Sequence, residues 1–408
     1  MGKEVRGLYQ GALILEGGGF RGVYTAGVLD YLMDQNIQFS DVYGISAGAC
    51  NALNYLSQNR GRYIKVAKEY CNDPRYMGIK QLVKTGSIFN WQFSFYEIGE
   101  KYVLFDYDTF YASPMHLWVG ATDCESGDCH WFSNQNGDDM LRSSIASSSM
   151  PLLSVIQQIG GRKYLDGGVA DSIPVQKALE DGHAKQLIVL TQNDGYVKKP
   201  NKMMPMIRRK YKAYPKLCQA MEHRHEKYNQ SVCLAKELEQ KGQAVILCPS
   251  KPMVLKRIEH DVDKLQAAYE NGYEDARAAS EKIRRLFEQL GKIDFIVGQL
   301  VVVQSGKIYY AFYQRGKPLA LFYDYIRALC AFFRRETVFN QFRKAAYACQ
   351  RGIHFVRHVC DKVVFRAFGA LCFGYVRYQK HVCVLRRIET QSIVAPVERA
   401  VKQSVFAA

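Results

Sequence analysis

Residues 41–56 read Asp-Val-Tyr-Gly-Ile-Ser-Ala-Gly-Ala-Cys-Asn-Ala-Leu-Asn-Tyr-Leu, an apolar strand that passes through a tight turn into a helix. The turn, Gly44-Ile45-Ser46-Ala47-Gly48, fits the pattern G-x-S-x-G. In this pattern the serine lies on a sharp strand-to-helix turn, and small flanking residues such as Gly44 and Gly48 let the turn close. The hydroxyl then stands above the sheet, where the start of the helix favours developing negative charge. Ser46 is therefore a candidate nucleophile.

A second glycine-rich turn precedes this one. Residues 11–16 predict a strand and residues 22–36 a helix, and between them lies Gly17-Gly18-Gly19-Phe20-Arg21-Gly22. Consecutive glycines at a helix start expose backbone N–H groups, which bind an anion such as a phosphate or a tetrahedral oxyanion. Because strand, glycine turn and helix follow one another twice within fifty residues, the sequence predicts a parallel sheet.

The same alternation continues along the chain, so we expect an α/β fold. Residues 63–112 predict a mixture of helix and loop. The further predicted strands are 115–122, 129–132, 164–166, 186–191 and 244–248, and the further predicted helices are 141–147, 217–241 and a long helix or helix pair over 262–290.

A third signal is Asp166-Gly167-Gly168, at the end of the predicted strand 164–166. A carboxylate at a strand end, followed by two glycines, can reach a neighbouring site without steric cover. Asp-Gly is also a common turn, so the motif gains weight only together with the other two.

Taken together, and in the order in which they occur along the chain, the three motifs resemble the patatin-like phospholipase family. That family has a G-G-G-x-[RK]-G loop, then a G-x-S-x-G nucleophile and a later D-G-[GA] base. The stretches 21–29, 146–151 and 164–169 are similar to the family as well. The resemblance covers about residues 8–295. It implies a three-layer α/β/α fold with a mainly parallel sheet, followed here by a C-terminal extension of uncertain structure.

The resemblance also implies a role for each motif. Ser46 would be the acyl nucleophile of a serine lipid acyl hydrolase, and Asp166 its base, without a histidine. Acyl-enzyme formation would depend on the amides of about Gly18, Gly19 and Phe20 as the oxyanion hole. Arg21 would orient the loop or face a lipid phosphate. The substrate would be a phospholipid or other fatty-acyl ester, and the chemistry requires neither a metal nor an organic cofactor.

Three alternatives remain open at this point. Gly17, Gly19 and Gly22 also fit the dinucleotide-binding pattern G-x-G-x-x-G, for which Asp41 has the right spacing but begins the second strand instead of ending it. The protein could equally be a catalytically silent member with a binding or regulatory role. A Ser-His-Asp triad would draw its histidine from His183, His223, His225 or His260.

The composition bears on where the protein acts and on its partners. The N-terminus has no secretion-signal pattern, so we expect the 12 cysteines to be reduced and the protein to be cytoplasmic. Residues 198–216 carry eight Lys and Arg, which face either solvent or an anionic membrane surface. We expect an acyl lipid and no nucleic acid as partner, and the sequence does not predict an oligomeric state.

The charge also divides the chain. We predict a hydrolase domain over residues 8–298, with a helical, lid-like part over about 198–298, and a tail over 299–408. The tail is basic and rich in aromatic residues, with 18 Lys and Arg against 5 Asp and Glu. It is a membrane- or nucleic-acid-binding module, a structural appendage, or a non-native, poorly ordered translation of sequence never selected as protein. The abrupt change in composition favours the third interpretation.

Overall fold

Short apolar runs form the central sheet, as the sequence predicts. The strands follow the order β5-β6-β3-β2-β1-β7-β8, and β4 pairs with β3 outside this path. The pairs β3/β2, β2/β1, β1/β7 and β7/β8 are parallel, whereas β3/β4, β3/β6 and β5/β6 are antiparallel. The strands are β1 (Tyr9–Leu15), β2 (Phe39–Ile45), β3 (His116–Asp123), β4 (Cys129–Ser133), β5 (Gln157–Ile159), β6 (Arg162–Asp166), β7 (Gln186–Val189) and β8 (Ala244–Leu247).

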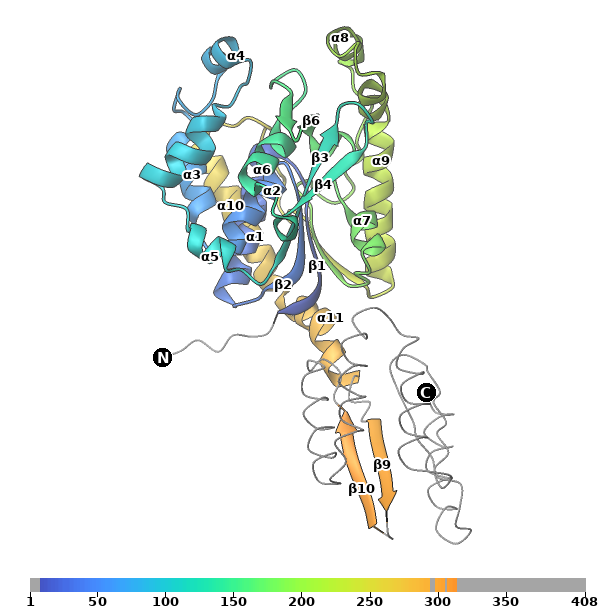
Figure 1. The fold of residues 1–408 in the computed structure, drawn as a ribbon. Helices are drawn as coiled ribbons and strands as arrows, with labels where there is room; N and C mark the ends of the chain where they lie inside the picture. Colours follow the sequence, from blue (N-terminus) through green and yellow to red (C-terminus); the bar gives the residue numbers. More distant parts are fainter. Residues whose placement is uncertain (1–7, 294–297, 305–306, 314–408) are drawn as a thin grey trace. The chain divides into compact units, whose positions relative to one another are not determined.

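Helices cover both faces of this sheet, so the predicted three-layer α/β/α architecture with a mainly parallel sheet is confirmed (Figure 1). One layer contains α1 (Gly22–Asp34), α2 (Ala47–Leu56) and α10 (Val262–Ala278), and the other contains α7 (Val175–Glu180) and α9 (Pro215–Gln240). Each layer has its own cluster of buried apolar side chains against the sheet.

Helices α1 and α10 approach each other closely because a glycine of each faces the other's backbone. A Cβ on Gly27 would lie 2.0 Å from the carbonyl oxygen of Tyr269, and one on Gly272 would lie 2.0 Å from that of Tyr24. Three tyrosine–aspartate hydrogen bonds then join the two helices: Tyr24–Asp275 at 3.0 Å, Tyr269–Asp30 at 2.7 Å and Tyr273–Asp34 at 2.9 Å. Helix α10 is thus a structural part of the same unit as α1.

The remaining elements lie around these layers. The stretch predicted as mixed contains α3 (Arg62–Tyr70), α4 (Ile79–Thr85), the π-helix η2 (Gln92–Tyr102) and α5 (Tyr107–Tyr111). The sequence did not predict the π-helix, which is a rare conformation. Further along are α6 (Met140–Ser148), α8 (Met204–Lys210) and α11 (Ser280–Ile293), and the short 3-10 turns are η1 (Gly19–Arg21), η3 (Asn134–Asn136) and η4 (Gly167–Val169).

This computed structural model describes residues 8–293, 298–304 and 307–313. The chain divides into two compact units, Met1–Gln289 and Leu290–Ala408. In the second, β9 (Gly298–Gln304) and β10 (Lys307–Tyr313) form an antiparallel pair. The rest of the predicted tail lies outside the described residues. Within the described ranges, no helix combines the length and apolar character needed to cross a membrane.

Candidate active site

Ser46 occupies a strained turn. β2 ends at Ile45 and α2 begins at Ala47, and Ser46 between them has φ 52° and ψ −119°. A positive φ is unusual for a residue with a side chain and is held in place only when the surroundings enforce it. A Cβ on Gly44 would lie 2.7 Å from Cα of Ala49, and one on Gly48 would lie 2.2 Å from the carbonyl oxygen of Leu15. Both flanking glycines are therefore required by close packing.

Asp166 lies beside Ser46, although 120 residues separate them in the chain. The Ser46 side chain is close enough to the Asp166 carboxylate to lower the pKa of that group. Both residues are buried, with 7% of each exposed. The Asp166 carboxylate also accepts the amide of Gly168 at 2.8 Å, and the backbone carbonyl of Asp166 accepts the hydroxyl of Thr122 at 2.8 Å. The G-x-S-x-G and Asp-Gly-Gly motifs thus meet as a serine–carboxylate pair.

Burial raises the pKa of the Asp166 carboxyl, because the charged form loses its hydration. The positive charge of Arg224, the hydrogen bond from Gly168 and the nearby Ser46 side chain act in the opposite direction. A raised pKa makes this carboxylate a stronger base than one in water, which suits it to accept a proton from an alcohol.

The glycine loop lies against the nucleophile. A Cβ on Gly17 would lie 3.0 Å from Cβ of Ser46, so only glycine lets the loop approach this closely. Gly19 has φ 59°, which turns the chain into η1. The loop therefore reaches the place where an oxyanion would form on a substrate bound to Ser46.

The hydrogen bonds of this loop narrow the predicted set of oxyanion donors. The amide of Phe20 donates to the carbonyl of Arg257 at 3.1 Å, so it is not available to a substrate. The amides of Arg21 and Gly22 point back to carbonyls of the same turn. Among the described residues, no backbone hydrogen bond occupies the amides of Gly18 and Gly19 or that of Gly17, so these three stay candidate donors, whereas the Phe20 amide does not.

The histidines that a triad would need have other partners. His183 Nε2 lies 3.2 Å from Asp41, and His260 Nδ1 lies 2.8 Å from the carbonyl of Cys71. His223 pairs with Glu226, and His225 contacts the carbonyl of Glu222. Within the described part of the chain, none of the four hydrogen-bonds to Ser46, which leaves Asp166 as its basic neighbour.

Asp41, the acid that dinucleotide binding would use, is occupied as well. Its carboxylate accepts the indole N–H of Trp118 at 3.1 Å and pairs with His116 at 3.3 Å, in addition to His183. These contacts hold the side chain between neighbouring strands, so it is not presented to a ribose at the glycine loop.

An apolar cavity of about 130 Å³ opens beside Ser46 and the glycine loop. Its single charged lining residue is Arg62, whose guanidinium donates to Asn54 Oδ1 at 3.0 Å and to the carbonyl of Val103 at 3.0 Å. Burial lowers the pKa of Arg62 to about 10. The cavity is otherwise dominated by aromatic side chains, namely Phe20, Tyr63, Tyr76, Phe89, Trp91, Phe95 and Phe105. Such a lining fits a hydrocarbon chain.

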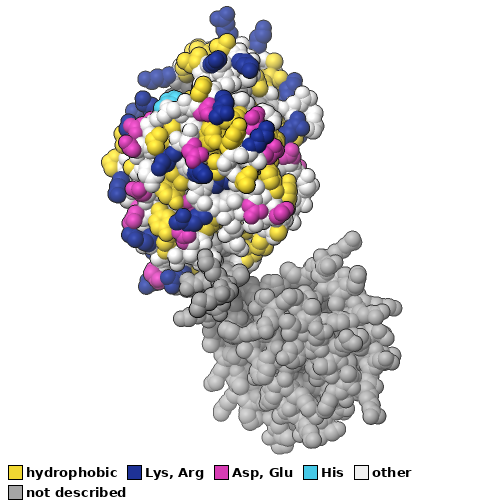
Figure 2. Space-filling model, turned by 90° about the vertical axis from the view of Figure 1, so that its left-hand side faces the viewer, with side chains coloured by type: hydrophobic (Ala, Val, Ile, Leu, Met, Phe, Trp, Pro, Cys, Tyr) yellow, Lys and Arg dark blue, Asp and Glu magenta, His cyan; other side chains and the backbone are white. Residues whose placement is uncertain are grey.

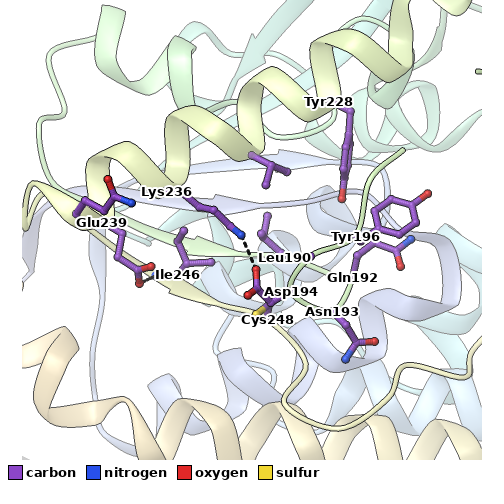
Figure 3. Close-up of a pocket in the computed structure, with 13 residues that line it drawn as sticks. Leu190, Gln192, Asn193, Asp194, Tyr196, Tyr228, Lys236, Glu239, Ile246 and Cys248 are labelled. Carbon is purple, nitrogen blue, oxygen red and sulfur yellow. Dashed lines mark hydrogen bonds and ion pairs between the residues drawn. The ribbon is translucent and has the colours of Figure 1, made fainter. Parts of the chain in front are cut away.

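A second cavity, of about 340 Å³, lies on the other side of the sheet between α9, β8 and the loop after β7 (Figure 3). Lys236 and Asp194 form an ion pair of 2.6 Å within it, and Tyr228 extends into it from α9. Neither Ser46 nor Asp166 lines this cavity, so it is separate from the serine–carboxylate pair.

Sequence reasoning missed several residues that position the site. Ser147 Oγ accepts the amide of Ser46 at 2.8 Å, and Arg224 donates to the carbonyl of Gly168. Glu16, only 2% exposed, accepts the amide of Thr191 at 2.5 Å. No local pattern marks Glu16 or Arg224, whereas Ser147 lies in the stretch 146–151 that resembles the family.

Two family models match parts of the chain. Residues 13–105 match the family model "Patatin-like phospholipase", and residues 214–288 match "Domain of unknown function (DUF6363)". The chain is 31% identical over 185 residues to "Uncharacterized protein YjjU" of Escherichia coli K12, an alignment that covers 44% of this chain and 51% of that protein. The chain thus spans about half the length of this curated relative.

Among solved structures, VipD from Legionella pneumophila matches with a TM-score of 0.35 and 12% identity, over 89% of this chain and 81% of VipD. The match to the patatin-like phospholipase model over residues 13–105 contains both the glycine loop and the Ser46 turn.

Proposed function

We propose that the protein is a serine lipid acyl hydrolase that cleaves fatty-acyl esters through a Ser46–Asp166 dyad. The observation that carries this proposal is the proximity of the strained Ser46 to the buried Asp166 carboxylate, next to both the glycine loop and the aromatic cavity. The cavity accommodates an acyl chain, which places the ester carbonyl at Ser46.

In the proposed reaction, Ser46 Oγ attacks the ester carbonyl while its proton passes to Asp166. The tetrahedral oxyanion is stabilised by amides of Gly17–Gly19, because fixed N–H dipoles need no reorganisation as the charge develops. Collapse of this intermediate breaks the ester bond, and Asp166 returns the proton to the leaving alcohol. Water then attacks the acyl-Ser46 ester with Asp166 as base, which releases the fatty acid and restores the serine.

The test is hydrolysis of medium-chain p-nitrophenyl esters and a phospholipid panel by the full chain. Ser46→Ala and Asp166→Asn are expected to lower kcat by roughly a thousandfold or more, as for other nucleophile and base deletions. Ser144→Ala is the matched control: Ser144 is buried on α6, and its hydroxyl has no hydrogen-bond partner among the described residues. Wild-type turnover in Ser46→Ala would refute the dyad. A folded wild-type protein without turnover on any ester would favour a binding role.

We further propose that the protein contacts an anionic membrane surface through α4 and α8. Both helices project at the end of the sheet where the parallel strands finish (Figure 1). The segment 152–155 joins their bases: the Ile88 amide donates to the Leu153 carbonyl, and the Leu152 amide donates to the Tyr211 hydroxyl. This segment follows Met150, which lines the aromatic cavity. The two helices therefore flank the entrance to the proposed active site.

The composition of the two helices suits a lipid surface. Residues 74–96 and 195–221 contain no Asp or Glu, and 195–221 contain eight Lys and Arg. Ile79 and Val83 on α4 are 78% and 83% exposed. Figure 2 shows Lys and Arg at the upper tip of the described part, with hydrophobic side chains between them. Basic residues attract anionic headgroups, and exposed apolar side chains insert between them.

Liposome co-sedimentation tests this contact. We expect binding that increases with the fraction of anionic lipid and falls in Val83→Asp and in Arg209→Glu. Tyr111→Asp and Lys241→Glu are the matched controls, because Tyr111 on α5 is 77% exposed and Lys241 is exposed just after α9. Binding that is indifferent to anionic lipid, or that falls equally in the controls, would remove the membrane contact.

A further inference from the structure

Four basic side chains converge beside the glycine loop and Asp166. They are Arg21, Lys198, Arg224 and Arg257, and we call them the basic cluster. Their positions follow from direct contacts. Arg224 donates to the carbonyl of Gly168, two residues from Asp166, and the carbonyl of Arg257 accepts the Phe20 amide at 3.1 Å. Arg21 ends η1, the turn that contains Phe20.

Lys198 is held against the same region by α9. Its backbone amide and carbonyl both hydrogen-bond to the side chain of Asn229, at 2.9 and 3.1 Å. Its ammonium lies 3.8 Å from the ring centre of Tyr228. Tyr228 in turn lies close to Glu16, the residue just before the glycine loop, whose charge raises the pKa of Tyr228. These contacts thus join four segments around one place, namely residues 16–21, 198, 224–229 and 257.

Positive charge exceeds negative charge around the basic cluster. The acidic groups that act most strongly on Arg21, Lys198 and Arg224 are Glu16 and Asp166, two carboxylates against four cations. Burial, together with the charges of Arg224, Arg257 and Arg21, lowers the pKa of Lys198 to about 7. Uncompensated buried cations are costly. When Lys198 is protonated, the basic cluster carries two more positive charges than the two carboxylates offset, and this excess in a partly desolvated region favours a bound dianion.

Two buried polar groups at this place also lack partners. Thr191 is fully buried, yet its hydroxyl makes no hydrogen bond among the described residues. This hydroxyl would lie 2.6 Å from a Cβ on Gly18. Nε of Arg21 is likewise buried without a partner in the described part of the chain. Buried polar groups are normally hydrogen-bonded, so these two indicate a ligand that offers acceptor oxygens.

Building on the proposed acyl-hydrolase function, we propose that the basic cluster binds a terminal phosphate monoester on the alcohol part of the substrate. The preferred substrate class is then an acyl ester of a short phosphorylated alcohol. The aromatic cavity receives the acyl chain on the α2 and α3 side of Ser46, and the cluster, with residues of α9 and the loop after β7, receives the phosphate on the opposite side. Guanidinium groups suit phosphate because their planar N–H groups can pair with two oxygens at once.

The first arm of the test measures selectivity in the full chain. The substrates are 1-oleoyl-glycerol 3-phosphate, 1-oleoyl-glycerol and 1-oleoyl-glycero-phosphocholine, with a p-nitrophenyl ester measured in parallel. We expect kcat/KM for the phosphomonoester to exceed that for 1-oleoyl-glycerol by at least about tenfold, the value of one charged hydrogen bond. In Lys198→Met and Arg257→Gln this ratio should fall towards one, whereas Lys241→Met should retain it.

The second arm measures binding to Ser46→Ala in the full chain, by calorimetry, with inorganic phosphate, 1-oleoyl-glycerol 3-phosphate and 1-oleoyl-glycerol. The proposal is supported if the phosphorylated lipid binds at least about tenfold more tightly than 1-oleoyl-glycerol and if this preference falls in Ser46→Ala/Lys198→Met. Binding of inorganic phosphate without a preference for the phosphorylated lipid overturns the substrate assignment. If inorganic phosphate does not bind and the phosphorylated lipid is not preferred, the phosphate site is overturned.

The two arms separate this proposal from the function on which it rests. Hydrolysis of the p-nitrophenyl ester and of all three lipids at equal kcat/KM would leave the hydrolase intact and refute the phosphate site. A wild-type protein that hydrolyses nothing but binds the phosphorylated lipid selectively would refute the hydrolase and support the phosphate site.

Discussion

The hydroxyl of Ser147 accepts a hydrogen bond from the backbone amide of Ser46 at 2.8 Å and donates one to the carbonyl of Gly120 at 2.6 Å. Ser147 is fully buried on α6, and Gly120 lies in β3. One hydroxyl therefore ties the strained Ser46 turn to the neighbouring strand. It also occupies the amide of Ser46, which is therefore not available to a substrate.

Ser147→Ala should consequently destabilise the protein and lower kcat more than it changes KM. The substitution leaves the Ser46 amide and the Gly120 carbonyl without a partner, which costs about 1–3 kcal/mol of unfolding free energy. Chemical denaturation and steady-state kinetics measure the two effects. Ser144→Ala on the same helix is the control, because its hydroxyl makes no hydrogen bond in the described structure. Equal stability of the two variants would show that the Ser147 contacts are dispensable.

The activity of the dyad should depend on pH through Asp166. The carboxyl must be ionised to accept the proton of Ser46, so kcat/KM should fall as the pH drops through the raised pKa of Asp166. Arg224→Gln removes the positive charge that lowers this pKa, so the acidic limb should move to higher pH, whereas Arg224→Lys should move it less. The measurement is kcat/KM for a p-nitrophenyl ester from pH 4 to 9.

Arg208→Gln is the control for that experiment. Arg208 is an exposed residue of α8 whose partner is Glu222, at 2.6 Å. Its removal should leave the acidic limb where it is in the wild type. A limb that stays in place in Arg224→Gln as well would contradict the assignment of Asp166 as the base.

Filling the aromatic cavity should shorten the acyl chain that the enzyme accepts. Val66 on α3 lines this cavity and is only partly buried, so Val66→Trp can project an indole into it at a modest cost in stability. We expect the ratio of kcat/KM for butyrate over dodecanoate p-nitrophenyl esters to rise at least about tenfold. Val232→Trp, which fills the separate cavity under α9, is the matched control and should leave the ratio unchanged. An unchanged ratio in Val66→Trp would place the acyl chain elsewhere.

The sequence predicted the architecture well because its signals are local. Apolar runs identify β1, β2, β3, β7 and β8, and the glycine turns place Ser46 and the loop at strand ends. The family resemblance added Asp166, which local patterns alone could not connect to Ser46. The predicted helix 217–241 corresponds to α9 (Pro215–Gln240), although nothing in that segment indicated that Arg224 reaches Gly168.

What could not be predicted depends on convergence in three dimensions. Glu16, Lys198, Arg224 and Arg257 are separated by up to 241 residues, and none belongs to a motif other than the general charge run at 198–216. β5 has three residues, too few for a periodic pattern, and the π-helix η2 has no sequence signature that distinguishes it from an α-helix. Phe20 fits the family's loop, but its amide is taken by Arg257, a contact that only the structure reveals.

The contact between α1 and α10 should be intolerant of any side chain at Gly272. In an ordinary helix Gly→Ala stabilises by roughly 0.5–1 kcal/mol, because glycine is a poor helix former. Here the new Cβ would lie 2.0 Å from the carbonyl of Tyr24, so the helices must separate. Gly272→Ala should therefore lower the free energy of unfolding, by about 1–3 kcal/mol for overpacking. Gly99→Ala in η2, where the nearest atom is 3.4 Å away, is the control. Stabilisation by Gly272→Ala would mean that the helices are further apart than described.

Lys198 provides a stability test of the basic cluster that does not depend on catalysis. Burial lowers its pKa to about 7, whereas an unfolded lysine titrates near 10.4. Between these values the unfolded chain binds more protons than the folded one, so the wild-type free energy of unfolding should gain a positive slope with pH over this window. Lys198→Met removes this contribution. Its stability relative to the wild type should be greatest at pH 6 and should decline as the pH rises from 7 to 10. Denaturation at pH 6, 8 and 9.5 measures this difference, with Lys241→Met as the control. A difference that stays constant over the three pH values would mean that Lys198 titrates as an ordinary lysine, outside the influence of Arg21, Arg224 and Arg257.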